Sequence, residues 1–342
     1  MQNQENQEKQ KELINKIYNG LKQNFKATEQ TIERILCVLL SGGHLLFNDK
    51  QGTGKTTLAK VISKLIDLEF KRIQFTSDLT PSDVTGINIF NPENREWEFH
   101  KGPIFSNIVL ADEINRAPYK TQSALLEAMP EKQVTIDGVT HKLSDNFFIL
   151  ATQNPSGYLG TYELPEAQID RFSMVLNLGY LSQEDEIDIL LGDYNADNIE
   201  SVISSKEFSL LKEMVKNVHV HKDIVEYIVK IVQKTRNDKN IETGASVRGS
   251  QMLLNCAKAL SLIRNNETVY PDDIKELSYY VLSHRFSLSD EAINKNLSKK
   301  DVIDNILASI SVLDKKNEDV VLDKEAKENK NTLLSKFNFK KS

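Results

Sequence analysis

The stretch NDKQGTGKTT, residues 48–57, follows a short apolar run at His44–Phe47 and precedes a helical pattern at Thr56–Leu68. A strand, a glycine-containing loop and a helix in this order are the context in which such a sequence predicts a phosphate-binding loop. Glycines let backbone N–H groups face phosphates, a lysine reaches the β and γ phosphates, and a threonine hydroxyl can hold Mg²⁺. The stretch therefore predicts a nucleotide site for ATP with Mg²⁺, against the alternative of an incidental glycine turn.

Within this loop, Lys55 is expected to contact the phosphates and Thr56 the metal. Asp49 replaces the first glycine of the full pattern, and aspartate tolerates left-handed backbone angles better than most residues. The expected nucleotide-binding set comprises Asp49, Lys50, Gln51, Gly52, Thr53, Gly54, Lys55, Thr56 and Thr57.

Further apolar runs follow the loop and are separated by helical or loop segments, at Phe70–Phe75, Ile108–Ala111, Phe147–Thr152 and Met174–Leu178. Near-continuous apolar strands that alternate with helices favour a parallel sheet covered on both faces. Two segments with strand periodicity interrupt this order, and each predicts a hairpin, at Ile87–Phe99 and at Val134–Leu143, the latter with a tight turn at Asp137-Gly138. We expect an α/β core over residues 26–179.

The flanking segments differ from this core in composition. Residues 1–25 are polar, with sparse apolar positions at helical spacing, and predict a mostly exposed leading helix. After Gly179 we expect no strands, and about five helical patterns, the first carried by Ile187, Leu190 and Leu191, predict a smaller all-helical domain over residues 180–315. Residues 316–342 are charged and Asn-rich, which indicates a weakly ordered tail or a marginal terminal helix.

Charge and cysteine content restrict the class of protein. Lys and Arg number 43 against 49 Asp and Glu, a net charge of −6, which gives no overall field to attract nucleic acid.

Cys37 and Cys256 lack metal-ligand spacing, which argues against a disulfide framework or a zinc site and fits a reducing cytosol. The N-terminus lacks a secretory signal, and the longest apolar run, Ile35–Leu40, falls short of the about 20 residues needed to span a bilayer. We expect a soluble, cytoplasmic protein.

Two carboxylates follow the apolar run at Ile108–Ala111, where a parallel sheet delivers residues to its ligand site. Asp112 is expected to hold the Mg²⁺ shell. Glu113 is then placed to orient or deprotonate the attacking water, since phosphoryl transfer depends on positioning and charge stabilisation. A solvated acidic strand end is the alternative, and the phosphate loop upstream favours the catalytic interpretation.

Asn154 follows the next apolar run and is expected at the same edge of the sheet. Its neutral amide could bridge the nucleophilic water and the γ phosphate. A turn-forming Asn before Pro155 is the alternative.

Two arginines are candidates for charge stabilisation. Arg171 ends a short helix opened by Pro165; it predicts an arginine finger that reaches the γ phosphate of a neighbouring subunit, although a cation is favoured at any helix C-terminus. Arg248 lies in a first helical turn after Ser246, where the helix dipole disfavours a cation, and so indicates an anionic partner. That partner is either a phosphate, which would couple nucleotide state to domain angle, or a surface ion pair.

Two longer stretches, FHKGPIFSNIVLADEINRAPYKTQSALLEAMPEKQVTIDG at 99–138 and ATQNPSGYLGTYELPEAQIDRF at 151–172, closely resemble the MoxR family of AAA+ ATPases. The resemblance extends from about Glu29 to Arg285 and includes SDLTPSDVTG at 77–86 and GASVRGSQ at 244–251. It therefore covers most of the chain, with far more specificity than the phosphate loop alone.

The resemblance implies a role for each candidate. It identifies Walker A at Asp49–Thr56, Walker B at Ile108–Glu113, sensor 1 at Asn154, an arginine finger at Arg171 and sensor 2 at Arg248. Arg116 is a second candidate for the contact to a neighbouring subunit. The two hairpins correspond to the helix-2 and pre-sensor-1 insertions, which face the pore or the client in such rings. Lys50 and Gln51 replace the valine and proline expected in the loop.

The resemblance also implies a homo-oligomeric, hexameric ring that hydrolyses ATP at subunit interfaces. Its implied role is chaperone-like: remodelling or activating client proteins, often von Willebrand factor A domain proteins, in complex maturation or metal insertion. One alternative is a related motor of a restriction or metal-chelatase complex, disfavoured by the acidic balance. The other is a nucleotide-dependent assembly switch with little hydrolysis, disfavoured by Glu113 and Asn154.

Overall fold

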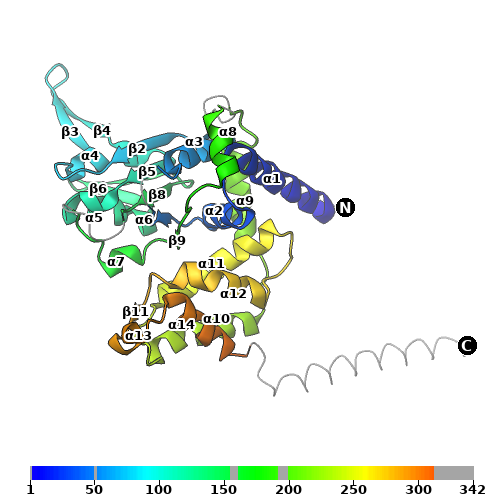
Figure 1. The fold of residues 1–342 in the computed structure, drawn as a ribbon. Helices are drawn as coiled ribbons and strands as arrows, with labels where there is room; N and C mark the ends of the chain where they lie inside the picture. The colour runs from blue at the N-terminus through cyan, green and yellow to red at the C-terminus, as the bar shows by residue number, and fades with distance from the viewer. Residues whose placement is uncertain (1, 50–51, 155–160, 192–198, 312–342) are drawn as a thin grey trace, which may run out of the picture.

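The computed structural model describes residues 2–49, 52–154, 161–191 and 199–311. The loop residues Lys50 and Gln51 and the charged tail at 316–342 lie outside these ranges. Figure 1 shows an α/β core with two projecting hairpins, and a mainly helical part packed against one end of it. None of the helices in the described ranges has the length and apolar character needed to cross a bilayer.

The core is built on a parallel sheet of five strands in the order β2-β5-β8-β1-β9. These strands are β1 (Leu45–Phe47), β2 (Phe70–Gln74), β5 (Ile108–Asp112), β8 (Phe148–Thr152) and β9 (Met174–Leu176). All five predicted strands are confirmed. The last one ends at Leu176, two residues earlier than predicted, because the N–H of Leu178 donates to the Asp49 carboxylate instead of to a strand.

Helices cover both faces of this sheet. On β1, Leu45 and Phe47 pack in one hydrophobic cluster while Leu46 packs in the other, so the strand is buried on both sides. The first cluster includes α1 (Gln2–Asn24), α2 (Glu29–Ser41) and α3 (Lys55–Leu65); the second includes α4 (Pro81–Thr85), η1 (Pro103–Phe105), η2 (Ile114–Arg116), α5 (Tyr119–Leu126), α6 (Ala128–Glu131) and α7 (Glu166–Ile169). The predicted three-layer core is confirmed.

The leading helix α1 packs on the core along one apolar stripe. Its four apolar residues Leu13, Ile14, Ile17 and Leu21 are buried in the first cluster, where α1 lies against α2 and α3. Most of the other described side chains of the helix are exposed, as predicted. The buried residues form one narrow stripe, which is the face that packs on the core.

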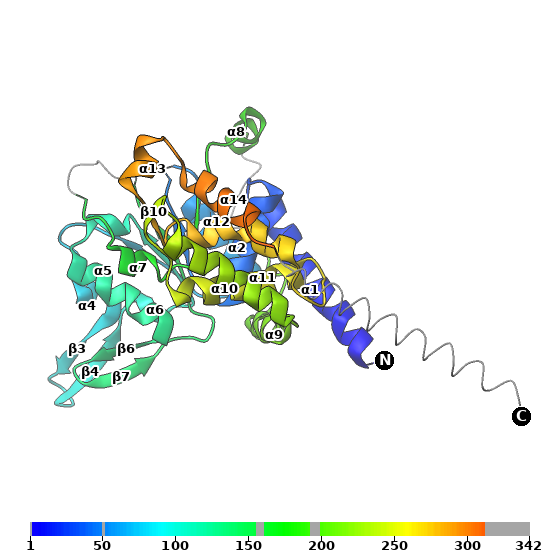
Figure 2. The same cartoon turned by 90° about the horizontal axis from the view of Figure 1, so that it is seen from below.

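The two predicted hairpins are confirmed. The first pairs β3 (Gly86–Asn91) with β4 (Glu96–Lys101), and the second pairs β6 (Gln133–Ile136) with β7 (Val139–Lys142). Asp137 and Gly138 both have positive φ, as the tight primed turn requires. The hairpins project side by side from the core (Figure 2), and the Asn88 amide donates to the Asp137 carboxylate at 2.6 Å. Trp97, 70% exposed, stacks edge-on against Phe90 on the first of them.

The second part of the chain is mainly helical. It contains α8 (Gln183–Leu190), α9 (Ser205–Asn217), α10 (Lys222–Asn237), α11 (Val247–Ile263), α12 (Pro271–Leu282), α13 (Asp290–Asn294) and α14 (Lys299–Ala308). The prediction that strands end after Gly179 is wrong at one place, where β10 (Ile241–Thr243) pairs antiparallel with β11 (Ser287–Leu288). Strands of two and three residues are too short to show a period in the sequence.

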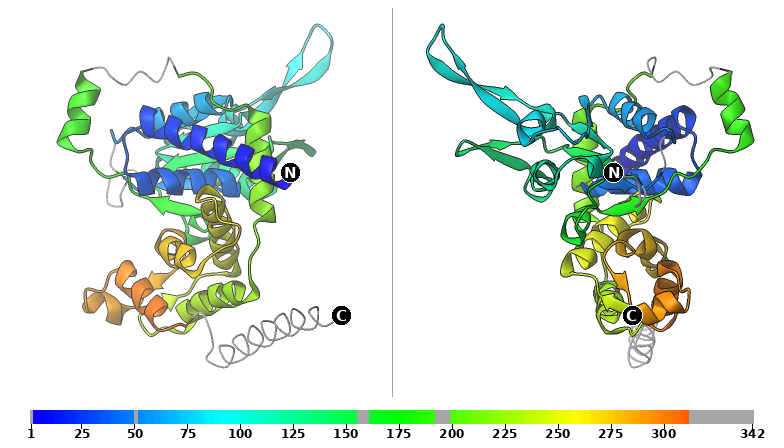
Figure 3. Two further views of the ribbon diagram at one scale, coloured as in Figure 1. Left: turned by 90° about the vertical axis from the view of Figure 1, so that its right-hand side faces the viewer. Right: turned by 60° about the vertical axis from the view of Figure 1, so that its left-hand side comes forward.

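Helix α8 stands apart from the other helices of this part (Figure 3). The apolar residues that predict it, Ile187, Leu190 and Leu191, are exposed, with Leu190 at 85%. Its contact with the core is ionic: Lys26 pairs with Asp188 at 2.8 Å and with Asp185 at 3.2 Å.

His44, just before β1, connects three parts of the core. Its Nδ1 accepts the N–H of Ile149 on β8 at 3.0 Å, and its Nε2 lies 3.3 Å from the carbonyl oxygen of Met129 on α6. A neutral ring with its proton on Nε2 satisfies both contacts. Burial lowers the pKa of His44 to about 3, so the ring is neutral in the folded protein at neutral pH.

We expect acid to destabilise the fold through His44. The unfolded histidine has a pKa of about 6.5, so between pH 6.5 and about 3 the unfolded state binds a proton that the folded state does not, at about 1.4 kcal/mol per pH unit. This stability is complete above pH 6.5 and is lost as the pH falls. Urea denaturation at pH 7, 6 and 5 should show a smaller loss for His44→Gln than for the wild type. The exposed His100, changed to Gln, serves as control and should leave the wild-type slope; equal slopes for all three proteins would contradict the assignment.

Candidate active site

The predicted phosphate loop opens helix α3. Gly52 and Gly54 have φ of +84° and +81°, a backbone region that strains any residue with a Cβ. Gly54 is the N-cap of α3, so the backbone N–H groups of the first turn have no partner within the helix and are available to an anion. The loop lines a cavity of about 360 Å³ formed by Gly52, Thr53, Gly54, Lys55, Thr56, Arg72, Gln74, Asp112, Glu113, Thr152 and Asn154.

Lys55 lies in this cavity and is 8% exposed as a residue. Its Nζ donates to the carbonyl oxygen of Asp49 at 3.2 Å and to the hydroxyl of Thr53 at 3.0 Å. Burial lowers the pKa of Lys55, and this effect exceeds the opposing influence of Asp49 and Asp112. Thr56 is half-buried beside it, whereas Thr57 is exposed and does not line the cavity.

The side chain of Asp49 connects the loop to a distant part of the chain. Asp49 is not among the described residues with positive φ, so the loop does not use the left-handed backbone angles that aspartate tolerates at this position. Its carboxylate instead accepts the backbone N–H of Leu178 at 2.6 Å and that of Gly179 at 3.4 Å. The loop is thereby fastened to the chain that leaves β9 for the second part of the protein.

The two acidic residues at the end of β5 are fixed by one hydroxyl of β8. Thr152 donates to Oδ1 of Asp112 at 2.7 Å and accepts the backbone N–H of Glu113 at 2.8 Å. Glu113 has φ of 55° and ψ of 48°, a left-handed conformation that a residue with a long side chain adopts only when its surroundings hold it there. The Thr152 contact is one such restraint.

Among the described residues, three side chains donate to the carboxylate of Glu113. Gln74 donates to Oε2 at 3.0 Å and Arg116 to the same oxygen at 2.8 Å, while Asn154 donates to Oε1 at 3.2 Å. Glu113 is 5% exposed. Asn115 in turn binds the backbone of Asn154 through both atoms of its amide. The site therefore brings the predicted Glu113 and Asn154 into direct contact.

Asp112 presents its second oxygen to an arginine on the neighbouring strand. Arg72 on β2 contacts Oδ2 through Nη2 at 2.7 Å and through Nε at 3.2 Å, and also donates to Gln74. Arg72, Gln74 and Thr152 are site residues that the sequence interpretation missed. The available signal was a polar residue at the end of an apolar run, as at Asp112, but the sequence does not tell that β2 lies beside β5.

A divalent ion would fit between Thr56 and Asp112. Both residues line the same cavity, and their hydroxyl and carboxylate oxygens are the hard ligands that Mg²⁺ prefers. The ammonium of Lys55 and the N-terminus of α3 face the same space and suit phosphate groups.

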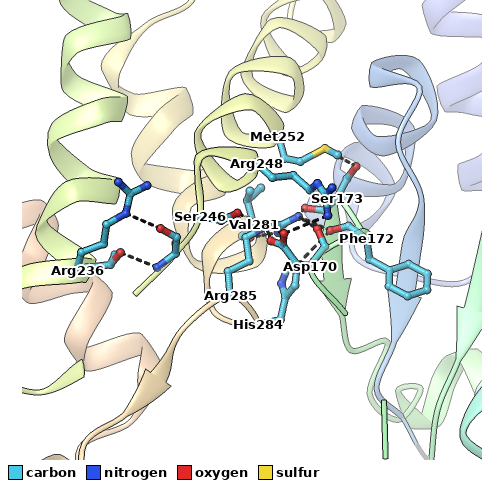
Figure 4. Close-up of polar contacts among 12 residues, drawn as sticks. Asp170, Phe172, Ser173, Arg236, Ser246, Arg248, Met252, Val281, His284 and Arg285 are labelled. Carbon is cyan, nitrogen blue, oxygen red and sulfur yellow. Dashed lines mark hydrogen bonds and ion pairs between the residues drawn. The ribbon is translucent and has the colours of Figure 1, made fainter. Parts of the chain in front are cut away.

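The predicted arginines Arg171 and Arg248 do not line this cavity. Arg171 donates through Nη1 to the carbonyl oxygen of Leu126 at 2.7 Å. Arg248 pairs with Asp170 at 3.3 Å, so the ion-pair alternative describes its contact here, and Figure 4 shows it beside Asp170 where the second part meets the core. Arg116, the second finger candidate, contacts Glu113 of its own chain.

Comparison with known proteins agrees with this geometry. The family described as "ATPase family associated with various cellular activities (AAA)" matches residues 44–174, and the AAA lid domain matches residues 233–306. YeaC of Bacillus subtilis is 47% identical over 280 residues, which cover 81% of this chain and 88% of that protein. Chaperone MoxR1 of Mycobacterium tuberculosis is 37% identical over 294 residues, covering 83% of this chain and 78% of that protein.

A crystal structure of a candidate ATPase from Cytophaga hutchinsonii superimposes with a TM-score of 0.83 at 36% identity, covering 92% of this chain and all of that one. The parallel sheet, the phosphate loop and the lid together define an AAA-type ATPase module. Within that class, the chain belongs to the MoxR family of AAA+ ATPases. We refer to residues 26–179 as the core and to the helical part after it as the lid.

We predict that Thr152→Val destabilises the protein by about 1–3 kcal/mol, because the buried N–H of Glu113 loses its acceptor while the side-chain volume is kept. Urea denaturation measures the free energy of unfolding. Thr140→Val is the matched control, since the hydroxyl of Thr140 is exposed on a hairpin and its loss should change stability by less than about 0.5 kcal/mol. Equal effects of the two substitutions would show that the Thr152 hydroxyl does not hold Glu113.

Proposed function

We propose that this chain is a Mg²⁺-dependent ATP hydrolase that works at the subunit interfaces of a homo-oligomeric, hexameric ring and remodels client proteins. The observation that carries the proposal is the arrangement around Glu113: its buried carboxylate touches Asn154 and lies in one cavity with Lys55 and Asp112. That set contains a phosphate-binding cation, a metal-binding carboxylate and a base, the groups that phosphoryl transfer to water needs.

Each residue has a distinct task in this mechanism. The backbone N–H groups of residues 52–56 and the ammonium of Lys55 bind the phosphates. Thr56 and Asp112 would hold Mg²⁺, which would offset the negative charge of the phosphates. Glu113 accepts a proton from the attacking water or orients it, and Asn154, at 3.2 Å from this carboxylate, aligns the same water.

The proposal that ATP is hydrolysed at subunit interfaces is based on the positions of the arginines. Arg171 and Arg248 lie outside the cavity of their own chain, which supports action of a finger on a neighbouring subunit. A planar guanidinium that is always charged suits the γ phosphate in the transition state. Arg171 is our candidate for this finger, and Arg116 is the alternative. Arg248 would sense the nucleotide from the lid.

The client-directed role rests on the name of one relative and on the hairpins. The Mycobacterium tuberculosis relative is named a chaperone. The first hairpin exposes Ile87, Phe90 and Trp97, an apolar surface on a projecting element that suits contact with a protein client. A von Willebrand factor A domain protein is the client class we favour, in complex assembly or metal insertion.

We predict that Glu113→Gln binds ATP with wild-type affinity but loses turnover by about 10²–10⁴-fold, because the amide cannot accept the proton of the attacking water. Phosphate release measures turnover, and the fluorescence of a labelled ATP analogue measures affinity. A protein that used ATP only as an assembly switch would show the same slow turnover before and after the substitution, and that result would contradict a hydrolytic role for Glu113.

We predict that Arg171→Ala lowers turnover by about 10³-fold or more and that mixing with Glu113→Gln subunits restores part of it. The Glu113→Gln subunits are inactive themselves but supply intact fingers to neighbouring sites. Phosphate release is measured across mixing ratios at constant total protein. Arg116→Ala is the comparison: a residue that acts on Glu113 of its own chain should not be restored by mixing. If mixing restored turnover to Arg116→Ala but not to Arg171→Ala, the arginine finger would be Arg116.

A further inference from the structure

Arg285, in the segment after α12, inserts from the lid into the chain around Arg171. Its side chain is 0% exposed. Figure 4 shows its guanidinium directed at Asp170, Phe172 and Ser173, which belong to the core. These residues flank Arg171 on both sides, and the arrangement places a lid cation against the finger segment, residues 170–173.

The contacts of Arg285 engage backbone as well as side chain. Nε lies 2.9 Å from Oδ1 of Asp170, and Nη2 donates to the carbonyl oxygens of Asp170, at 3.0 Å, and Phe172. Nη1 reaches the carbonyl oxygen of Ser173 at 3.5 Å and that of Val281 within the lid. One planar group therefore binds the backbone of the finger segment before and after Arg171.

The charge of Arg285 makes this contact hard to release. Burial lowers the pKa of Arg285 to about 10, so the group remains protonated at neutral pH. A buried cation that loses its carboxylate partner is strongly unfavourable, because no water replaces the lost contacts. The pair between Arg285 and Asp170 is thus a lasting connection between the lid and the core.

Asp170 also receives a second, weaker lid contact. Arg248 reaches its Oδ2 at 3.3 Å and is 39% exposed, and the hydroxyl of Ser246 reaches the same oxygen at 3.3 Å. Exposed ion pairs contribute little stability. Arg248 can therefore leave Asp170 for another anion at small cost, while Arg285 keeps the finger segment attached to the lid.

The core holds the finger segment at its other side. The backbone N–H of Arg171 donates to Gln168 on the short helix α7, and the Arg171 side chain donates to Leu126 at the end of α5. Arg171 consequently lies between a core contact and a lid contact. A shift of the lid relative to the core must act on its backbone through Arg285.

We propose that Arg285 is a positioning residue that attaches the finger segment to the lid, so that movement of the lid in one subunit sets the finger presented to the next. The inference rests on the proposed ring ATPase. It makes Arg285 necessary for turnover at the neighbour's site and dispensable for ATP binding at its own.

The test uses Arg285→Lys, which keeps the charge but cannot bind a carboxylate and several carbonyls at once, and the milder Asp170→Asn. Both full-length variants are first checked for wild-type secondary structure and ATP affinity. We expect kcat to fall by about 10-fold or more with KM near the wild-type value. Addition of Glu113→Gln subunits should raise phosphate release, as for Arg171→Ala, because those subunits supply correctly held fingers.

Arg264→Gln is the matched control. Arg264 is another lid arginine with ion pairs, to Glu33 of α2 at 3.0 Å and to Asp273 and Glu276 of the lid, and it does not contact the finger segment. Its substitution should leave turnover near wild type, or lower it in a way that mixing does not restore. Two outcomes would overturn this inference and leave the proposed function intact. One is a wild-type kcat in Arg285→Lys and Asp170→Asn. The other is a loss of turnover that Glu113→Gln subunits fail to restore although they restore Arg171→Ala.

A second measurement separates the inference from the proposed function. If the wild-type protein binds ATP without turnover, the proposed hydrolysis at ring interfaces is wrong. The connection of the finger segment to the lid through Arg285 is then tested by amide hydrogen exchange. On addition of ATP, exchange at residues 168–173 should change together with exchange at residues 247–252 of α11 in the wild type but not in Arg285→Lys. Unlinked changes in the wild type would overturn the connection itself.

Discussion

The hydroxyl of Thr152 binds Asp112 and the backbone of Glu113 at the same time, and the rest of the site depends on this contact. It requires β5 and β8 to lie parallel and in register, so that their carboxyl ends meet. With Glu113 held in a left-handed conformation, its carboxylate turns toward Asn154 and away from solvent. The sheet thus determines which acidic group faces the phosphate loop and at what angle.

The central residues of the site could be predicted because each follows an apolar run, Lys55 after the glycine-containing loop and the other three at once or nearly so. Lys55, Asp112, Glu113 and Asn154 lie at the carboxyl ends of predicted strands or just after them, and a parallel sheet collects those ends at one edge. Arg72, Gln74 and Thr152 could not be identified in the same way. They belong to the site because of the order of strands in the sheet, in which β2 and β8 lie on either side of β5. The local sequence pattern of a strand does not tell which strands will be its neighbours.

The features of the fold that the sequence interpretation left out share one physical cause: a partner elsewhere in the chain. The stripe of α1 is buried because α2 and α3 lie beneath it, and the ribbon of β10 and β11 exists because the lid brings two short segments together. The carboxylate of Asp49 finds its donors 129 and 130 residues further on. Propensity and periodicity depend on neighbours within a few residues in the sequence, whereas these three features are determined by tertiary packing.

The same Asp49 contact bears on where the chain can be divided. Its carboxylate binds the N–H groups of Leu178 and Gly179, beyond the last strand, so the start of the phosphate loop is anchored by the chain that leaves β9. A fragment that ended at Leu176 would contain the whole sheet and yet lack an anchor for its nucleotide loop. The border between core and lid is therefore a poor site for splitting the protein, for inserting a tag or for exchanging lids between relatives, and a graft should carry residues 177–179 together with the core.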